Sequence, residues 1–149
     1  TPKVIEYNCR FGDPETQVIL PKYDGDLAEL LMDAAKSQFT KNEILPMNND
    51  HYLCLVLASS GYPGYYPKGY KINGLDKIEE GSFIIHAGTK KEDNSIVTSG
   101  GRVLGIVSQG QTLKEAKYIS YKTAEIVDFT GKYYRNDIGD KGIKRYNRV

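Results

Sequence analysis

The sequence has few of the residues that build disulfide frameworks or metal clusters. It contains two cysteines and two histidines in 149 residues. Cys9 and Cys54 each lie in an apolar, strand-like run, which is the pattern of buried thiols in a reducing compartment. His86 has no second histidine or cysteine nearby, so it does not predict a metal site. We therefore expect a fold without structural disulfides.

Other absences limit the partners. No apolar run reaches the roughly 18 residues that a membrane span needs, and no signal peptide is visible. The formal net charge is only +1, whereas nucleic-acid-binding proteins usually carry a marked basic excess. Internal repeats are absent. We expect a cytoplasmic protein that binds neither membrane nor nucleic acid, built as one domain or as a small domain with an appendage.

The most informative stretch lies near the start of the chain. Residues 3–8 have the β-branched and aromatic content of a strand, and alternate side chains of a strand share a face. Glu6, Asn8 and Arg10 would then place a carboxylate and an amide oxygen together, with a cation beyond them. Magnesium prefers such hard oxygen donors, so the pattern predicts a site for a metal-bound polyphosphate. From composition alone, however, the pattern is more typical of the exposed face of a half-buried strand.

Gly12, Asp13 and Pro14 should end this strand and begin a helix. Asp13 is a good N-cap, and proline suits the first helical position. A helix start would gather backbone N–H groups near Arg10, where they favour anions.

A second helix is expected from Asp26, as its cap, to about Gln38. Its apolar residues follow the spacing of one buried stripe and should form core; they are Leu27, Leu30, Leu31 and Ala34. Residues 39–50 are polar and broken, so we interpret them as a linker and place the domain boundary there.

The remainder predicts strands, one helix and short turns. Strands are expected at residues 52–59, 83–87, 96–98, 103–107 and 129–134. Thr112 and Glu115 form a capping box that opens a helix to about Val127, with Leu113, Ala116, Ser120, Ala124 and Val127 facing inward. A turn at 135–139 brings a cation and an anion together, and the basic tail 141–148 should be solvated and frayed. Segregated strands with short turns predict an α+β fold with a mainly antiparallel sheet and a packed helix.

Two loops leave alternatives open. Residues 61–70 are rich in glycine, proline and tyrosine, and they either line a substrate mouth or form a surface loop held by its tyrosines. Residues 99–102 allow close approach of a ligand or of another backbone segment. Arg102, beside two glycines at a strand start, either binds a phosphate or carboxylate or forms an ion pair that locks the hairpin.

Several motifs together resemble one enzyme family. The run RFGDPETQ at 10–17, together with Glu6 and Asn8, resembles the signature of phosphoribosylamine–glycine ligase, or glycinamide ribonucleotide synthetase. The resemblance continues through GYPG at 61–64, HAGTK at 86–90, GGRVL at 100–104 and RNDIG at 135–139. These motifs occur in the family's order and cover nearly the whole chain.

The resemblance implies a C-terminal piece of a longer enzyme, which the absence of an initiator methionine also favours. Residues 1–45 would be the C-terminal end of an ATP-grasp domain, and residues 50–149 the family's C-terminal domain. In this family ATP phosphorylates the glycine carboxylate, and the amine of 5-phosphoribosylamine displaces phosphate in purine biosynthesis. The partners would be glycine, 5-phosphoribosylamine, ATP and the missing N-terminal and ATP-grasp portions.

The resemblance also assigns residues. Glu6 and Asn8 match ligands of Mg²⁺ or Mn²⁺, and Arg10 would be catalytic by steadying the transferring phosphoryl group. Asp13 would contact a substrate ammonium or only cap the helix, the interpretation we favour, and Arg102 would approach the phosphoribosyl end.

An ATP-grasp enzyme has lysines that bind the nucleotide phosphates, a glycine-rich lid and an adenine pocket. These features have no counterpart in the chain, so we expect the chain to be inactive alone. The alternative is a free-standing, non-catalytic binding module with the same fold. Because residues 3–8 would lack the rest of their sheet, we expect them to pair with another copy or with an edge of the C-terminal domain.

Overall fold

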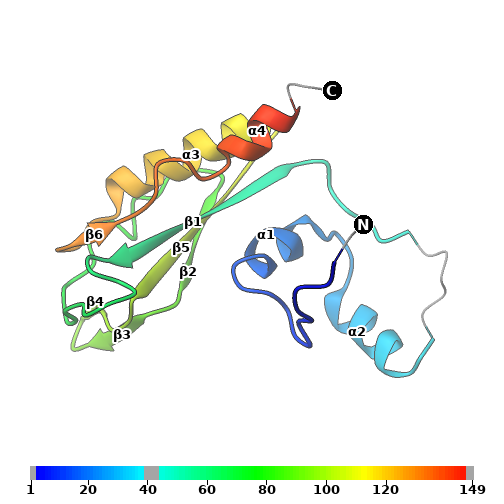
Figure 1. Ribbon diagram of the computed structural model, residues 1–149, viewed down its shortest axis with the longest axis horizontal. Coiled ribbons are helices and arrows are strands. Elements are labelled where there is room, and N and C mark those ends of the chain that lie inside the picture. Colours follow the sequence, from blue (N-terminus) through cyan, green and yellow to red (C-terminus); the bar gives the residue numbers. More distant parts are fainter. Residues whose placement is uncertain (1–2, 39–43, 147–149) are drawn as a thin grey trace. The chain divides into compact units, whose positions relative to one another are not determined.

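The chain divides into two compact units, unit 1 at Thr1–Asn49 and unit 2 at Asp50–Val149. The computed structural model describes residues 3–38 and 44–146, so residues 39–43 of the linker expected at 39–50 lie outside the described residues. In chain order the elements are α1 (Thr16–Ile19), the 3₁₀ helix η1 (Leu20–Lys22), α2 (Leu27–Ala35), β1 (His51–Ser59), β2 (Ser82–His86), β3 (Thr89–Glu92), β4 (Ser95–Thr98), β5 (Arg102–Gly110), α3 (Leu113–Ile126), β6 (Lys132–Tyr133) and α4 (Asp140–Tyr146) (Figure 1).

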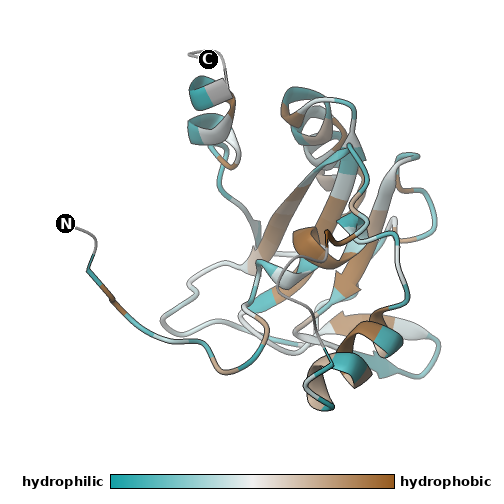
Figure 2. Cartoon of the chain, turned by 90° about the vertical axis from the view of Figure 1, so that its right-hand side faces the viewer, coloured by the Kyte–Doolittle hydropathy of each residue, from teal (hydrophilic) through white to brown (hydrophobic). Residues whose placement is uncertain are grey.

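Unit 2 is built on a four-stranded antiparallel sheet in the order β2-β5-β1-β6, beside the antiparallel pair β3-β4. The strands expected in unit 2 and their antiparallel arrangement are confirmed, although the last strand is limited to residues 132–133. The strands carry mostly hydrophobic residues (Figure 2), and α3 contacts β5 and β1. The structure adds β3, where the sequence predicted no strand. None of the helices in the described ranges is long and apolar enough to cross a membrane.

Helix α3 begins and ends with side-chain hydrogen bonds. The backbone N–H of Glu115 donates to Thr112 Oγ1 at 3.1 Å, as the capping box predicted. The Glu115 carboxylate reaches one residue further back than in a standard box and accepts from Gln111 N at 2.8 Å. At the other end, Lys132 Nζ donates to the carbonyls of Ala124 and Val127 at 2.8 and 2.7 Å. These last carbonyls lack intrahelical partners, so the lysine stabilises the helix end.

The core of unit 2 lies between α3 and one face of the sheet. Alternate residues of β1 point into it, so that Leu53, Leu55 and Leu57 are buried. The inward stripe expected on α3 is confirmed, with Leu113 half-buried and the other members, Ala116, Ser120, Ala124 and Val127, fully buried. Three hydroxyls join this interface, because Ser82 Oγ lies 2.7 Å from Ser108 Oγ and 3.0 Å from Thr123 Oγ1. The sequence did not predict that network.

The front of unit 1 differs from the expectation. Residues 3–8 form no strand, and no bridge joins them to another described residue, so the expected strand is wrong. Pairing of residues 3–8 with another copy, or with an edge of unit 2, stays a prediction. A strand without ladder partners is not stable in water. Cys9 is exposed and Cys54 half-buried, so the expectation of two buried thiols is wrong for Cys9.

The first helix also begins later than expected. It starts at Thr16, spans four residues and has Glu15 as an N-cap without a side-chain hydrogen bond. Asp13 and Pro14 lie in the preceding turn. The predicted Asp13 cap is therefore wrong, and so short a helix makes no anion site near Arg10.

Helix α2 has the predicted cap but not the predicted burial. Asp26 Oδ1 accepts from the backbone N–H groups of Ala28 and Glu29 at 2.8 and 3.1 Å, and the helix ends at Ala35 rather than at Gln38. No residue of α2 is buried, and 47% of Leu31 is exposed. The helix pattern found the apolar stripe correctly, but the expectation that it forms core within this chain is wrong.

The C-terminal segment is ordered where a frayed tail was expected. Residues 140–146 form α4, and Asp140 makes an ion pair with Lys117 of α3. Gly139 precedes this helix with φ +87°, and a Cβ at that position would lie 2.7 Å from Leu53 Cδ1. The turn into α4 therefore depends on a residue without a side chain. Residues 147–149 lie outside the described part.

We predict that Gly139→Ala destabilises the chain through both backbone strain and overpacking. The left-handed conformation costs about 1–2 kcal/mol for a residue with a side chain, and overpacking costs about 1–3 kcal/mol more. Urea unfolding measures the sum. Gly69→Ala is the matched control, because Gly69 has φ +85° with nothing within 4 Å of an added Cβ. Equal losses for the two variants would contradict the packing account.

Candidate functional site

The candidate metal ligands lie side by side even without a strand. Asn8 Nδ2 donates to Glu6 Oε1 at 3.4 Å, and both residues are exposed. Turning the Asn8 amide by half a rotation would present its oxygen instead. Arg10, also exposed, donates from Nη1 to the Phe11 carbonyl at 2.8 Å. The segment thus offers a carboxylate, an amide and a guanidinium to solvent, without burial to fix them.

These donors fit part of a magnesium or manganese site. Carboxylate and amide oxygens are ligands that both ions accept. Within the described ranges, however, no group of three or more histidine, cysteine, aspartate or glutamate side chains is placed to hold a metal ion. Glu6 and Asn8 could therefore supply two ligands, and nucleotide phosphates, water or residues outside this set would have to supply the rest.

Asp13 holds a neighbouring side chain instead of a helix end. Gln17 Nε2 donates to Asp13 Oδ1 at 2.9 Å. The other amide atom, Gln17 Oε1, is buried and accepts no hydrogen bond within the described structure. Such a group usually has a partner, because an unpaired buried acceptor is costly. Asp13 therefore fixes an amide whose oxygen needs a donor.

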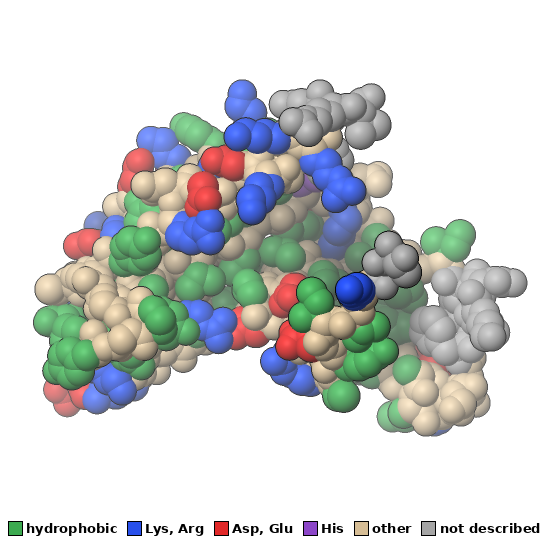
Figure 3. Space-filling model, viewed as in Figure 1, with side chains coloured by type: hydrophobic (Ala, Val, Ile, Leu, Met, Phe, Trp, Pro, Cys, Tyr) green, Lys and Arg blue, Asp and Glu red, His purple; other side chains and the backbone are tan. Residues whose placement is uncertain are grey.

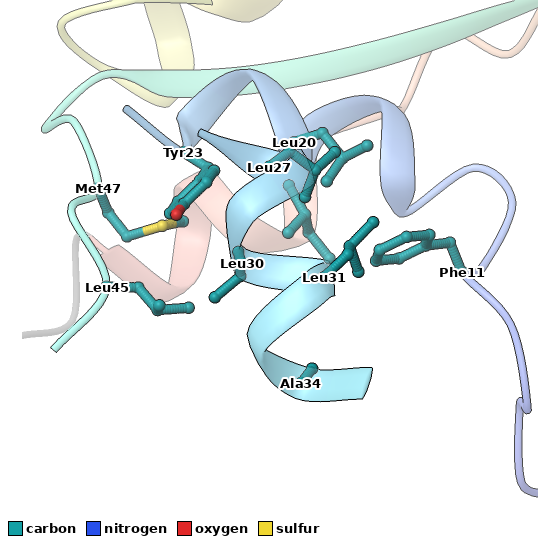
Figure 4. Close-up of a pocket in the computed structure, with 10 residues that line it drawn as sticks. Phe11, Leu20, Tyr23, Leu27, Leu30, Leu31, Ala34, Leu45 and Met47 are labelled. Atoms are coloured by element: carbon teal, nitrogen blue, oxygen red, sulfur yellow. The ribbon is translucent and has the colours of Figure 1, made fainter. Parts of the chain in front are cut away.

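Unit 1 also contains an apolar hollow of about 370 Å³. Figure 4 shows Leu27, Leu30 and Leu31 of α2 turned toward it, with Phe11 on one side and Tyr23 and Met47 on the other. The full lining, called the apolar hollow below, is Phe11, Ile19, Leu20, Tyr23, Leu27, Leu30, Leu31, Ala34, Leu45 and Met47. The lining includes the α2 stripe that the sequence predicted as core, and none of the residues of this stripe is buried.

Arg102 lies in unit 2, exposed at the start of β5. Its carbonyl accepts from Gly88 N at 2.8 Å. A Cβ on Gly88 would lie 2.6 Å from the Cα of Gly100, so both glycines are needed where the two segments cross. The close approach expected at 99–102 is thus to another backbone segment. The anion contact and the ion pair of Arg102 both stay predictions.

The loop at 61–70 packs against the same turn. A Cβ on Gly101 would lie 2.0 Å from the Tyr62 ring, so Tyr62 covers that glycine. Ser59 secures the turn by donating from N to Gly101 O at 2.8 Å and from Oγ to Gly100 O at 3.0 Å. Tyr62 and Tyr66 meet edge to face at 6.0 Å. The motifs GYPG, HAGTK and GGRVL therefore meet at one end of the sheet, and the tyrosines hold the loop there.

His86 has a local partner, as expected for a structural histidine. Its Nδ1 lies 2.9 Å from Thr89 Oγ1.

The RNDIG motif forms the turn that the sequence predicted. Arg135 binds Asp137 with two hydrogen bonds, Nε to Oδ1 at 2.8 Å and Nη2 to Oδ2 at 2.6 Å. The hydrogen bond and charge of Arg135 lower the pKa of the Asp137 carboxyl. Tyr121 of α3 closes the turn, since its hydroxyl donates to Arg135 O at 2.7 Å and accepts from Ile138 N at 3.2 Å. The sequence did not single out Tyr121, which lies on α3 one turn after Lys117.

We predict that Arg135→Gln raises the pKa of Asp137 toward its ordinary value, because the largest cause of the lowering is removed. A carboxyl with a lowered pKa contributes stability above its unfolded pKa, and this is lost as pH falls through the folded pKa. Carbon-detected NMR titration of Asp137 measures the shift. Lys122→Gln, which removes a charge that pairs with Glu125, should leave the titration unchanged. A shift of the same size in both variants would exclude the paired geometry.

Comparison with known proteins gives consistent matches. The family model described as "Phosphoribosylglycinamide synthetase, C domain" matches residues 52–141. A phosphoribosylamine–glycine ligase of Caldanaerobacter subterraneus is 49% identical over 92% of this chain and 32% of its own length. That of Halalkalibacterium halodurans is 46% identical over 95% of this chain and 32% of its own length. The Gallus gallus trifunctional purine biosynthetic protein adenosine-3 is 42% identical over 95% of this chain and 14% of its own length.

A solved structure agrees with the sequence matches. The crystal structure of phosphoribosylamine–glycine ligase from Thermotoga maritima superposes with a TM-score of 0.77 at 36% identity, over 92% of this chain and 33% of that one. The chain thus spans about a third of the single-activity ligases it matches. Because the family model covers most of unit 2, the chain belongs to the phosphoribosylglycinamide synthetase C-domain family.

Proposed function

We propose that this chain is the C-terminal part of a cytoplasmic phosphoribosylamine–glycine ligase. The carrying observation is the similarity to proteins of that name along more than nine-tenths of the chain, which extends beyond the C domain matched at residues 52–141. The chain would act with the larger portion that it does not contain. The coarser conclusion, membership of a ligase family with relatives in purine biosynthesis, rests on the relatives' names.

The proposed reaction has two steps. A glycine carboxylate oxygen attacks the γ-phosphorus of ATP, which gives glycyl phosphate and releases ADP. The amine of 5-phosphoribosylamine then attacks the glycyl carbonyl carbon, phosphate leaves, and the amine loses a proton to give glycinamide ribonucleotide. Both steps handle strongly anionic groups, so positioning and charge stabilisation dominate catalysis.

The residues of unit 1 would serve the first step. Glu6 and Asn8 would hold Mg²⁺ or Mn²⁺ with their oxygens. When bound, the ion would offset the negative charge of the nucleotide phosphates. Arg10 would donate hydrogen bonds to the transferring phosphoryl group. Since Asp13 is not a helix cap, we propose the other role for it, orientation of a substrate ammonium.

We predict that the isolated chain has no measurable ligase activity and binds Mg·ATP only weakly. Two oxygen ligands on an exposed segment leave the cation mostly hydrated. Isothermal titration calorimetry of the chain with Mg·ATP measures this directly. Micromolar affinity would contradict the assignment of the phosphate-binding groups to the missing portion.

Activity is testable in a chimera in which this chain replaces the matching third of the Caldanaerobacter ligase. We predict ADP formation that depends on glycine and phosphoribosylamine. Glu6→Gln should lower turnover far more than melting temperature, because an exposed carboxylate contributes little to folding whereas charge acting on phosphoryl transfer lowers the barrier. Glu80→Gln removes another exposed carboxylate, in unit 2, and is the control. An inactive chimera that folds would favour the alternative of a non-catalytic binding module.

In the same chimera, Arg102→Ala should raise the Michaelis constant for phosphoribosylamine more than that for ATP. Loss of one charged hydrogen bond to a phosphate costs about 1.5–3 kcal/mol, which is roughly tenfold or more in the constant. Steady-state kinetics with each substrate varied separately gives the comparison. Earlier melting with unchanged kinetics would assign Arg102 to an ion pair of the hairpin instead.

A further inference from the structure

Unit 1 lacks the buried core that a stable domain needs. None of its described residues is buried, whereas unit 2 buries a continuous cluster of aliphatic side chains. Large apolar side chains of unit 1 are instead exposed over roughly half or more of their surface; they include Ile5, Phe11, Ile19, Leu31, Met32 and Ile44. Hydrophobic side chains are accordingly visible on the surface in Figure 3. Exposed apolar patches of this kind mark interaction surfaces.

Four apolar side chains of α2 lie along one side of the helix. The apolar hollow takes four residues of the helix at the spacing of a single stripe, and its other residues come from segments before and after the helix. An acidic depression of about 200 Å³ adjoins it, sharing Tyr23, Leu30 and Leu45 and adding Asp26, Glu29 and Asp33. The surface is therefore apolar with carboxylates on one rim.

One buried polar atom of unit 1 also lacks its partner. Gln17 Oε1 is shielded from solvent, and no described residue donates to it. Its other amide atom is already held by Asp13, so the amide orientation is fixed. An N–H or O–H donor from outside the described chain would satisfy it.

We propose that the apolar hollow is the docking surface for the portion of the ligase that this chain does not contain. The inference rests on the proposed function, and the missing length supports it, since the related ligases are about three times as long as the segment matched here. The docking portion presents apolar side chains to the hollow, lysine or arginine to the rim of Asp26, Glu29 and Asp33, and a donor to Gln17. This contact supplies the core that unit 1 lacks, which holds residues 6–17 in place for phosphoryl transfer.

Two neighbouring residues of α2 provide a matched test. Leu31 lines the hollow and is 47% exposed, while Met32 does not line it and is 53% exposed. Melting is measured for Leu31→Asp and Met32→Asp in the 149-residue chain and in the chimera with the Caldanaerobacter ligase. In the chain alone the two variants should behave alike, because both side chains contact water.

In the chimera, Leu31→Asp should lower the folding equilibrium constant about tenfold or more relative to Met32→Asp, because a carboxylate is forced into an apolar contact. Equal melting of the two variants in an active chimera would overturn the docking surface while leaving the proposed function intact. An inactive wild-type chimera would overturn the proposed function instead, and the melting comparison would still report on the surface.

Two other occupants give different results. If the isolated chain sediments as a dimer that Leu31→Asp dissociates and Met32→Asp does not, the hollow is the contact between two copies. If Leu31→Asp raises the Michaelis constant for one substrate of the chimera without changing its melting, the hollow holds that substrate. Either result overturns the proposal.

Discussion

The structure depends on the burial of one sheet face under α3. The middle of its inward stripe consists of small residues, Ala116, Ser120 and Ala124, which are fully buried and permit a close approach of the helix to the sheet. Ser120 directs its hydroxyl toward the Leu53 carbonyl at 3.5 Å, and Thr123 joins the hydroxyl network with the two strand serines. Apolar burial supplies most of the stabilisation, and these polar contacts permit fewer alternative positions of the helix.

The connections around α3 then follow from hydrogen bonds at its ends and sides. Lys132 satisfies the last carbonyls, Tyr121 closes the turn at 135–139, and Lys117 contacts both that turn and α4. Basic and acidic side chains are interspersed on the face seen in Figure 3, in keeping with the small net charge. At the far end of the sheet, glycines let three motif-bearing loops pack closely together, and Arg102 lies exposed beside them at the start of β5.

The success of sequence reasoning differs between the units for a physical reason. In unit 2 the strands, the capping box of α3 and its buried stripe were predictable. Their partners all lie within the same unit, so the local patterns agree with the packing. The Asp26 cap was predictable because it is local. Burial of the α2 stripe and a strand at residues 3–8 were predicted wrongly, since both depend on partners distant in sequence, and a local pattern does not show whether such partners are present. Helix α4 was missed because its charged sequence resembles a frayed tail, and the Lys117–Asp140 contact that fixes its start is non-local.

The same distinction bears on the candidate site. Residues two apart in an extended segment stay on one side even without a sheet, so Glu6 and Asn8 remain neighbours, at a hydrogen-bonding distance of 3.4 Å. What the isolated segment cannot supply is rigidity, because catalytic groups act only when their orientation is fixed before the reaction. The exposed side chains of Glu6 and Asn8 retain rotamer freedom, and they must lose this freedom when a ligand binds. A sequence can therefore specify the ligand types of a site within a few residues, whereas the affinity of that site is set by the surfaces that pack around it.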